Sequence, residues 1–181
     1  MTNTIFTVEM KNMLKKIVGK CFLDYECTKI SDTETFGNIR LYLDGLTLEI
    51  INEVHEEHFF NENEDITYFE VKEVDKNAPF KPYLVKDFKK FPVNKTITGL
   101  EIINDQIDVG NGTYTFSYDQ ALVIHMGNDV LMLARDVWFI ETIFISSNDN
   151  LEAVCPLSDV VETMSCNGEY DVKVNRRRTT L

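Results

Sequence analysis

Residues 36–54 read FGNIRLYLDGLTLEIINEV, and this stretch decides the fold class. Apolar and polar residues alternate on both sides of Asp44-Gly45, a dipeptide that favours a tight turn between two antiparallel strands. A second stretch with the same pattern, QALVIHMGNDVLMLARDV, covers residues 120–137. The sequence therefore predicts two β-hairpins of the same kind, and it raises the question of whether either carries a functional site.

The likeness between the two parts of the chain extends beyond the hairpins. An apolar-Lys-Lys-apolar pattern precedes each hairpin, and strand-like stretches lie on both sides of it. The patterned segments are 14–22 and 88–97, and the strand-like stretches are 22–30, 66–74, 97–109 and 141–149. In register, Leu48, Ile50 and Val54 align with Leu131, Leu133 and Val137. This order favours duplication over residues 10–75 and 84–150; the alternative is that small β meanders share generic alternation.

The two hairpins differ in the polarity of one face. In the first hairpin this face carries Thr47, Glu49, Glu53 and His55, with Ile51 as the exception. The aligned face of the second hairpin carries Val130, Met132, Ala134, Asp136 and Trp138. A strand that is apolar on both faces is typical of a covered position in a sheet. We therefore expect the second hairpin to be central and the first to show one face to water or to a partner.

The predicted fold class is mainly β, a β-rich α+β arrangement. A duplicated four-strand unit is expected to form a sheet or barrel-like core, with a short C-terminal helix over 156–166, where Leu157, Val160, Val161 and Met164 have helical spacing. The first repeat with its N-terminal segment covers 1–75, a linker 76–84, the second repeat 85–155, and a strand with a disordered basic tail 167–181, in one compact unit. Residues 8–17 fit a helix or a strand equally.

Charge narrows the partners that the protein can bind. The 181-residue chain has a formal net charge of −12 and an isoelectric point near 4.6, and 44% of its residues are hydrophobic, enough for a real core. Such a charge disfavours binding to nucleic acid and to anionic membranes, and it attracts a basic partner. The alternative is that the acidity serves solubility alone.

The sequence predicts a cytoplasmic location. The N-terminus lacks the apolar run of a signal peptide, and no stretch approaches the roughly 18 apolar residues of a membrane-spanning helix. In a reducing compartment the four cysteines, Cys21, Cys27, Cys155 and Cys166, are expected to be free thiols.

The search for chemistry predicts no catalytic residue, cofactor or metal. His55-Glu56-Glu57-His58 resembles a zinc motif, but the histidines have i, i+3 spacing and would lie on opposite faces of a strand. No serine lies on a glycine-flanked turn, and the glycine cluster at 109–113 is typical of a hairpin turn. His125 is expected to be a partly buried core histidine. These observations favour a protein that is not an enzyme.

The best candidate for a partner-binding site lies between the third and fourth strands of the first repeat. Acidic side chains crowd there with aromatic ones interleaved, a pattern in which the charges steer a basic partner and the aromatic rings anchor it. The candidate residues are His55, Glu56, Glu57, His58, Phe59, Phe60, Glu62, Glu64 and Asp65. The alternative is a solvated loop whose phenylalanines turn inward.

Residues 93–163 resemble a class of small β-rich bacterial proteins, several of which occur near polymorphic toxin systems. The resemblance is carried by NKTITGLEIINDQIDV, by YTFSYDQALVIHMGNDVLMLARDVWFIETIFI and by a closing P-x-x-D-x-V-E segment. Arg135, Asp136, Trp138, Phe139 and Glu141 match its strand-pair motif, which implies that Trp138 and Phe139 are core anchors. It implies no catalytic site.

Together, charge, candidate site and resemblance predict an immunity protein that neutralises a bacterial toxin by occluding its basic active site. Two alternatives remain open. The first is a small-ligand or metal-binding β protein that uses a cleft between the repeats, and the second is a structural or phage-type assembly component. The sequence leaves the oligomeric state open.

Overall fold

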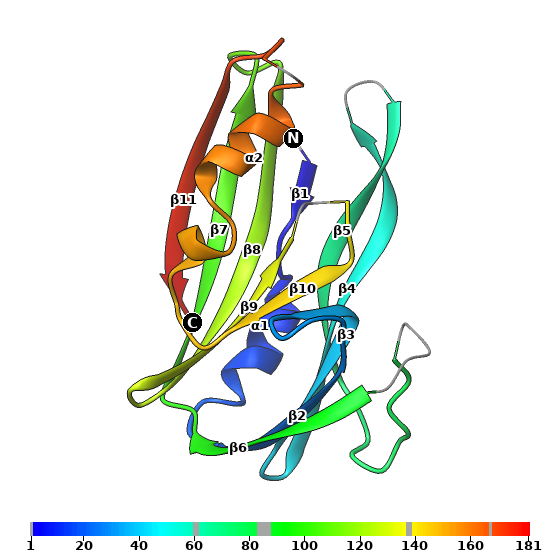
Figure 1. Ribbon diagram of the computed structural model, residues 1–181, viewed down its shortest axis with the longest axis vertical. Coiled ribbons are helices and arrows are strands. Elements are labelled where there is room, and N and C mark those ends of the chain that lie inside the picture. Colours follow the sequence, from blue (N-terminus) through cyan, green and yellow to red (C-terminus); the bar gives the residue numbers. More distant parts are fainter. Residues whose placement is uncertain (1, 60–61, 83–87, 137–138, 167) are drawn as a thin grey trace.

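The computed structural model describes residues 2–59, 62–82, 88–136, 139–166 and 168–181 (Figure 1). Its elements in chain order are β1 (Thr2–Thr4), α1 (Val8–Lys15), β2 (Cys21–Lys29), β3 (Glu34–Leu43), β4 (Leu46–Phe59), β5 (Glu62–Glu73), β6 (Phe88–Thr96), β7 (Gly99–Val109), β8 (Tyr114–Met126), β9 (Asp129–Arg135), β10 (Thr142–Ser146), the 3-10 helix η1 (Leu151–Ala153), α2 (Leu157–Met164) and β11 (Val172–Thr180). The fold is mainly β, as predicted, with one 11-stranded sheet and two short α-helices, of which α2 is the expected C-terminal helix.

The sheet contains two antiparallel units with the same strand order. The first unit is β6-β2-β3-β4-β5 and the second is β11-β7-β8-β9-β10. In each unit the chain makes a four-strand meander, and the strand that follows the meander returns to pair with the meander's first strand. Each unit also has an irregular register between its first two strands, after Phe22 and Cys27 in the first unit and after Ile103 in the second.

One pairing joins the two units into one sheet, and a second pairing adds the N-terminal strand to the second unit. On one side β10 pairs antiparallel with the start of β3, where Thr142 lies opposite Phe36. On the other side β1 pairs parallel with β8, where Thr4 lies opposite Tyr118. Among the described residues β5 pairs with β4 alone, so the sheet stays open between β5 and β1 (Figure 1). The expected barrel therefore does not close.

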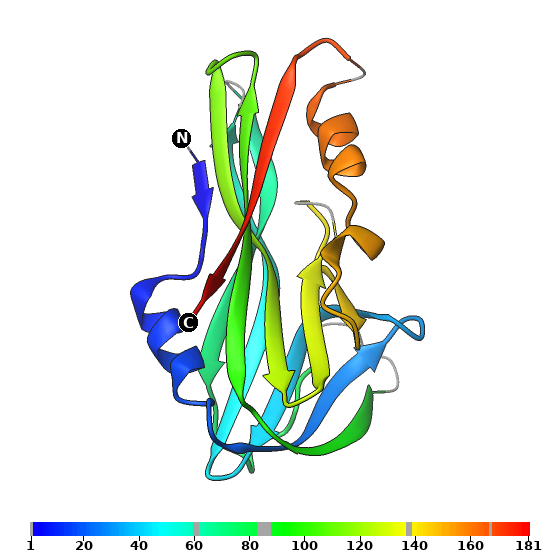
Figure 2. The ribbon, with the colours of Figure 1, turned by 90° about the vertical axis from the view of Figure 1, so that its left-hand side faces the viewer.

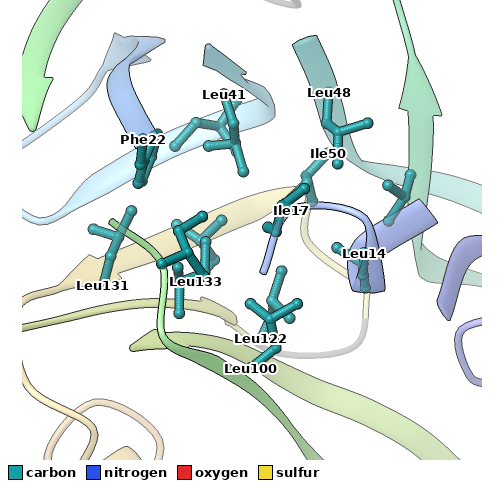
Figure 3. Close-up of a cluster of buried hydrophobic side chains, with 14 of the residues drawn as sticks. Leu14, Ile17, Phe22, Leu41, Leu48, Ile50, Leu100, Leu122, Leu131 and Leu133 are labelled. Carbon is teal, nitrogen blue, oxygen red and sulfur yellow. The ribbon is translucent and has the colours of Figure 1, made fainter. Parts of the chain in front are cut away.

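One hydrophobic cluster fills the space between the two units (Figure 3). Positions that correspond in the two hairpins enter it together: Leu41 with Ile124, Leu48 with Leu131, and Ile50 with Leu133. Burying one such side chain stabilises the fold by about 1.5–3 kcal/mol. The cleft between repeats that a ligand-binding alternative requires is thus occupied by aliphatic side chains.

The N-terminal segment forms a helix, although the proposed repeat aligned part of it with a segment that forms a strand. Residues 14–22 and 88–97 do not correspond in structure, because the first is the end of α1 with the start of β2 and the second contains β6. The Thr7 side chain accepts a hydrogen bond from the Met10 amide and caps α1. Leu14 and Ile17 then bury completely in the cluster between the units, so helical spacing wins over strand alternation.

The basic tail is ordered, which corrects the expectation of disorder. Residues Val172–Thr180 form β11, paired with β7 along its whole length. Arg176 explains why the tail is ordered, because its guanidinium makes two ion pairs that attach the strand to the rest of the protein. It makes a two-pronged ion pair with the fully buried Asp105 at 2.8 Å and a second pair with Glu152 at 2.6 Å.

The second hairpin is covered on both faces, as expected from its apolar pattern. Its outer face (Ala121, Val123, Met132 and Ala134) packs with Leu151 of η1. The outer face of the first hairpin is more buried than predicted near its turn, because residues 75–82 lie against it. There Arg40 donates to the Ala78 carbonyl at 2.7 Å and pairs with Glu49 at 2.9 Å.

Several smaller expectations have clear outcomes. Asp44-Gly45 makes the predicted turn between β3 and β4, with Gly45 at a φ of 69°. The four cysteines are free. Phe139 is 47% exposed rather than a core anchor, because it follows the end of β9 in an irregular connection, and Trp138 lies outside the described residues. No helix among the described residues has the length and apolarity needed to cross a membrane.

Candidate functional site

The candidate residues lie on a two-stranded arm that leaves the body of the sheet. β3 pairs with β4 only up to Ile51, whereas β4 and β5 stay paired with each other out to Phe59 and Glu62. We call residues 52–59 and 62–69 the arm; it is the long hairpin at the upper right of Figure 1. Its sequence contains six acidic residues and no lysine or arginine.

The strands extend further than the sequence suggested. We expected the acidic residues in a connection, but β4 runs to Phe59 and β5 starts at Glu62, so most of them lie in paired strands. The strong cross-strand register explains this difference, because it continues without a break from Leu48 opposite Glu73 to the arm tip. Phe60 lies outside the described residues, and the side chains of Phe59 and Glu62 are not described either.

The register sorts the candidate side chains onto two faces. One face carries Glu56 opposite Asp65 and His58 opposite Asn63; the other carries Glu57 opposite Glu64 and His55 opposite Ile66. His55 and His58 therefore lie on opposite faces, as the strand alternation predicted, and cannot bind one metal ion together.

Two consecutive cross-strand pairs on the arm are pairs of carboxylates. Glu56 opposes Asp65 and Glu57 opposes Glu64, and like charges in directly opposite positions destabilise a strand pair. Among the described residues, the only side chains that donate hydrogen bonds to these four carboxylates are neutral. Asn63 donates to Glu56 at 3.0 Å, and the Tyr68 hydroxyl donates to Glu57 at 2.7 Å. Burial, and then this hydrogen bond, raise the pKa of Tyr68.

The root of the arm is fixed to the protein. Ile66 is fully buried and packs with Val160 and Met164 of α2 and with Phe116 of β8. Tyr68 packs against the same cluster from the arm side. The tip residues Glu56, His58, Glu64 and Asp65 are exposed. The arm thus presents its acidic end from a rigid base.

A fully buried arginine behind the arm was not predicted from the sequence. Arg135 reaches from β9 across the interior to the open side of the sheet, where it donates to the Thr67 carbonyl of β5 and, at 3.1 Å, to the Thr4 hydroxyl of β1. Its guanidinium also lies over the Tyr118 and Phe69 rings. Burial lowers the pKa of Arg135 to about 10. This side chain bridges the gap between β1 and β5.

The small cavity beside α2 does not have the features of a thiol enzyme. It has a volume of about 70 Å³ and is lined by residues that include Tyr118, Cys155, Asp159 and Thr163. Burial raises the pKa of the Cys155 thiol to about 11, so this thiol is protonated at neutral pH. A cysteine nucleophile requires the opposite shift.

The arm also gathers three groups that sequence spacing did not bring together. Ligand atoms of Glu53, His55 and Glu70 all lie within 4.8 Å of one another. Glu70 comes from β5, and only the register of the hairpin could have located it beside the two β4 residues.

No protein-family model matches the chain, and no curated protein or solved structure matches it either.

Proposed function

We propose that this is a non-enzymatic, acidic protein-binding protein whose arm docks onto a basic surface of a protein partner. In its specific form, the proposal is a cytoplasmic immunity protein that neutralises a bacterial toxin by occluding the toxin's basic active site. The observation that carries the proposal is two consecutive carboxylate pairs, Glu56 with Asp65 on one face and Glu57 with Glu64 on the other, on a hairpin that no third strand covers among the described residues.

Electrostatics favours this use of the arm. Opposed carboxylates cost stability in the free protein, and a partner that brings lysines or arginines between them relieves that cost on binding. The net charge of −12 adds a long-range attraction that speeds encounter with a basic surface. Since a nuclease must hold phosphates with basic residues, its active site is the kind of surface that such an arm complements.

The resemblance of residues 93–163 to proteins near polymorphic toxin systems supports the toxin as the partner. These residues lie mainly in the second unit, which supplies the body of the protein, while the arm belongs to the first unit. The proposal therefore assigns scaffolding to the second unit and recognition to the first.

We further propose that the two units arose by duplication, with repeats at β2–β6 and β7–β11 rather than at the boundaries that the sequence suggested. Their identical strand order and the matching core positions support this. In this account the second unit shortened its equivalent of the arm, since β9 and β10 are 7 and 5 residues long while β4 and β5 are 14 and 12.

The test is co-expression with the toxin domain encoded beside the gene for this protein. We expect the wild-type chain to restore growth and to form a one-to-one complex. Glu56→Gln with Glu64→Gln, which removes one charge from each carboxylate pair, should weaken the complex at least tenfold and flatten its dependence on salt. The matched control is Glu162→Gln with Glu169→Gln, two exposed acids that are not part of the arm. Equal affinity of the two double variants would contradict recognition by the arm, and failure of rescue and binding by the wild type would contradict the immunity role.

A second measurement tests whether the opposed carboxylates destabilise the free protein. The Glu56→Gln/Glu64→Gln variant should be more stable than the wild type by up to about 1 kcal/mol, because it removes two like-charge pairs. Urea unfolding at low and high salt measures this, and the gain should shrink in high salt. A variant that loses stability would show that the carboxylates are not in conflict.

A further inference from the structure

Glu53, His55 and Glu70 meet on one face of the hairpin near the root of the arm. Glu53 and His55 are two residues apart on β4 and so share a face, and Glu70 reaches the same face from β5. Nε2 of His55 lies 3.9 Å from Oε1 of Glu70, and the ligand atoms of all three residues lie within 4.8 Å of one another. We propose that these three residues bind a divalent first-row transition-metal ion such as Zn²⁺.

The donor set selects this class of ion. An imidazole with two carboxylates suits zinc and its neighbours in the first transition row, whereas Mg²⁺ and Ca²⁺ prefer sites made of oxygen alone. Three protein ligands from one face leave at least one coordination position for water or for a group from another molecule. The site is therefore of the open kind.

The ligands need only small movements to reach bonding distance. Donor atoms bound at about 2.0–2.2 Å from a tetrahedral ion lie about 3.4 Å from one another. The present spacing of up to 4.8 Å closes to this value by side-chain rotation, since both strands are already held by their register. No change in the backbone is required.

Neighbouring side chains orient two of the three ligands. The Tyr68 ring packs edge-on against the His55 imidazole, with ring centroids 5.0 Å apart. The Lys72 ammonium lies 2.5 Å from Oε2 of Glu70, which leaves Oε1, the oxygen nearer His55, for the ion. Such outer contacts fix ligand orientation in metal sites.

Charge around the site favours a cation. On the same face the arm adds Glu57 and Glu64 to the two carboxylate ligands, and Lys72 is the one ammonium that pairs with a ligand among the described residues. A bound divalent ion would offset part of this negative charge. The inference is independent of the proposed partner, because the three ligands come from this chain alone.

The experiment is calorimetric titration of untagged, metal-free protein with Zn²⁺. The protein carries Cys166→Ser, so that the exposed Cys166 thiol does not compete for the ion. We expect one site per chain, with affinity that falls in acid because protons compete for the ligands. His55→Ala, Glu53→Gln and Glu70→Gln should each weaken binding at least tenfold. Proton NMR should show the His55 ring signals shifting on addition of Zn²⁺.

Matched controls exist on the opposite face of the same hairpin. His58→Ala and Glu56→Gln remove the same kinds of group from the other face and should leave the affinity within twofold of the parent protein. The proposal is wrong if the parent binds Zn²⁺ more weakly than about 1 mM. It is also wrong if Glu56→Gln lowers the affinity as much as Glu70→Gln does, since binding would then reflect diffuse acidity rather than a site.

Discussion

At the scale of single residues, buried polar side chains hold together the two junctions between the units. Arg135 and Asn52 occupy corresponding positions on β9 and β4, and both are fully buried. Asn52 donates to the carbonyls of Ile140 at 3.1 Å and Thr142 at 3.3 Å, beside the junction of β10 with β3. Arg135 does the same for the Thr67 carbonyl at the open side. Among the described residues, the longer side chain lies at the junction where β5 and β1 are not paired by backbone hydrogen bonds.

Replacing Arg135 tests this role. Arg135→Met keeps most of the side-chain volume but removes the guanidinium hydrogen bonds to the Thr67 carbonyl and the Thr4 hydroxyl, so we expect a loss of about 1–3 kcal/mol in the free energy of unfolding. Urea unfolding measures the loss, and the exposed Arg177→Met is the control, expected within about 0.5 kcal/mol of wild type. An Arg135→Met variant at least as stable as wild type would mean that guanidinium desolvation outweighs its hydrogen bonds.

The buried Cys155 thiol predicts a decline in stability at alkaline pH. Burial raises its pKa from 9.0 to about 11 in the folded protein. Below pH 9 the thiol is protonated whether or not the chain is folded; between pH 9 and 11 only the unfolded chain ionises, so stability falls as pH rises. The fall is at most about 2–3 kcal/mol. Comparing urea unfolding of wild type and Cys155→Ala across this range checks it, because the substitution should flatten the decline.

At the scale of elements, β11 shows how one ion pair turns a basic tail into a strand. Alternate residues of β11 face opposite sides of the sheet, so Arg176 meets the buried Asp105 while the exposed Arg177 points to the other face. Three consecutive arginines therefore have different environments. The two faces of this part of the sheet carry different helices, since α1 and α2 lie on opposite sides of the strands β11, β7 and β8 (Figure 2).

A double-mutant cycle measures the contribution of this ion pair. Arg176→Met leaves the Asp105 carboxylate buried and unpaired, so we expect a loss of about 3–5 kcal/mol in urea unfolding. Combining it with Asp105→Leu should recover much of that loss, because no buried charge remains. Arg177→Met, one residue along, should have little effect. An equal loss for Arg176→Met and Arg177→Met would assign the order of β11 to backbone pairing alone.

At the scale of the whole molecule, the open side of the sheet depends on the N-terminal segment. β1 lies beside β8, and Phe6 follows it into the core, where its ring stacks on Phe69 of β5 at 5.8 Å. The Phe6 amide donates to the buried Asp119 at 2.7 Å. These side-chain contacts hold the open side together, whereas backbone hydrogen bonds hold the junction of β10 with β3.

Phe6→Ala should weaken this side of the molecule selectively. We expect a loss of about 3–5 kcal/mol for removal of a buried phenylalanine ring, against a small effect for Ile5→Ala, whose side chain is 42% exposed. Hydrogen exchange should show β5 amides near Thr67 losing protection before those at the junction of β10 with β3. Uniform loss of protection across the sheet would contradict a separate role for the segment.

Sequence patterns were sufficient for the two hairpins, their turns and α2, because alternation, turn dipeptides and helical spacing are local signals. The hairpin with Asp44-Gly45 at its turn and the buried Val160 and Met164 of α2 are examples. The same signals were insufficient where two interpretations of a segment were equally good. Of residues 8–17, Val8–Lys15 form a helix because its apolar side can be buried, and that burial depends on the rest of the fold.

What the sequence by itself determined is thus the class of the fold, the hairpins and the acidic character of residues 55–65. Tertiary structure alone decided which groups face each other: Glu56 with Asp65, His55 with Glu70, and Arg135 with Thr67. It also decided that β6 and β11 return to the first strand of each unit. Register and strand order follow from contacts between residues far apart in the chain, and such contacts leave no local pattern in the sequence.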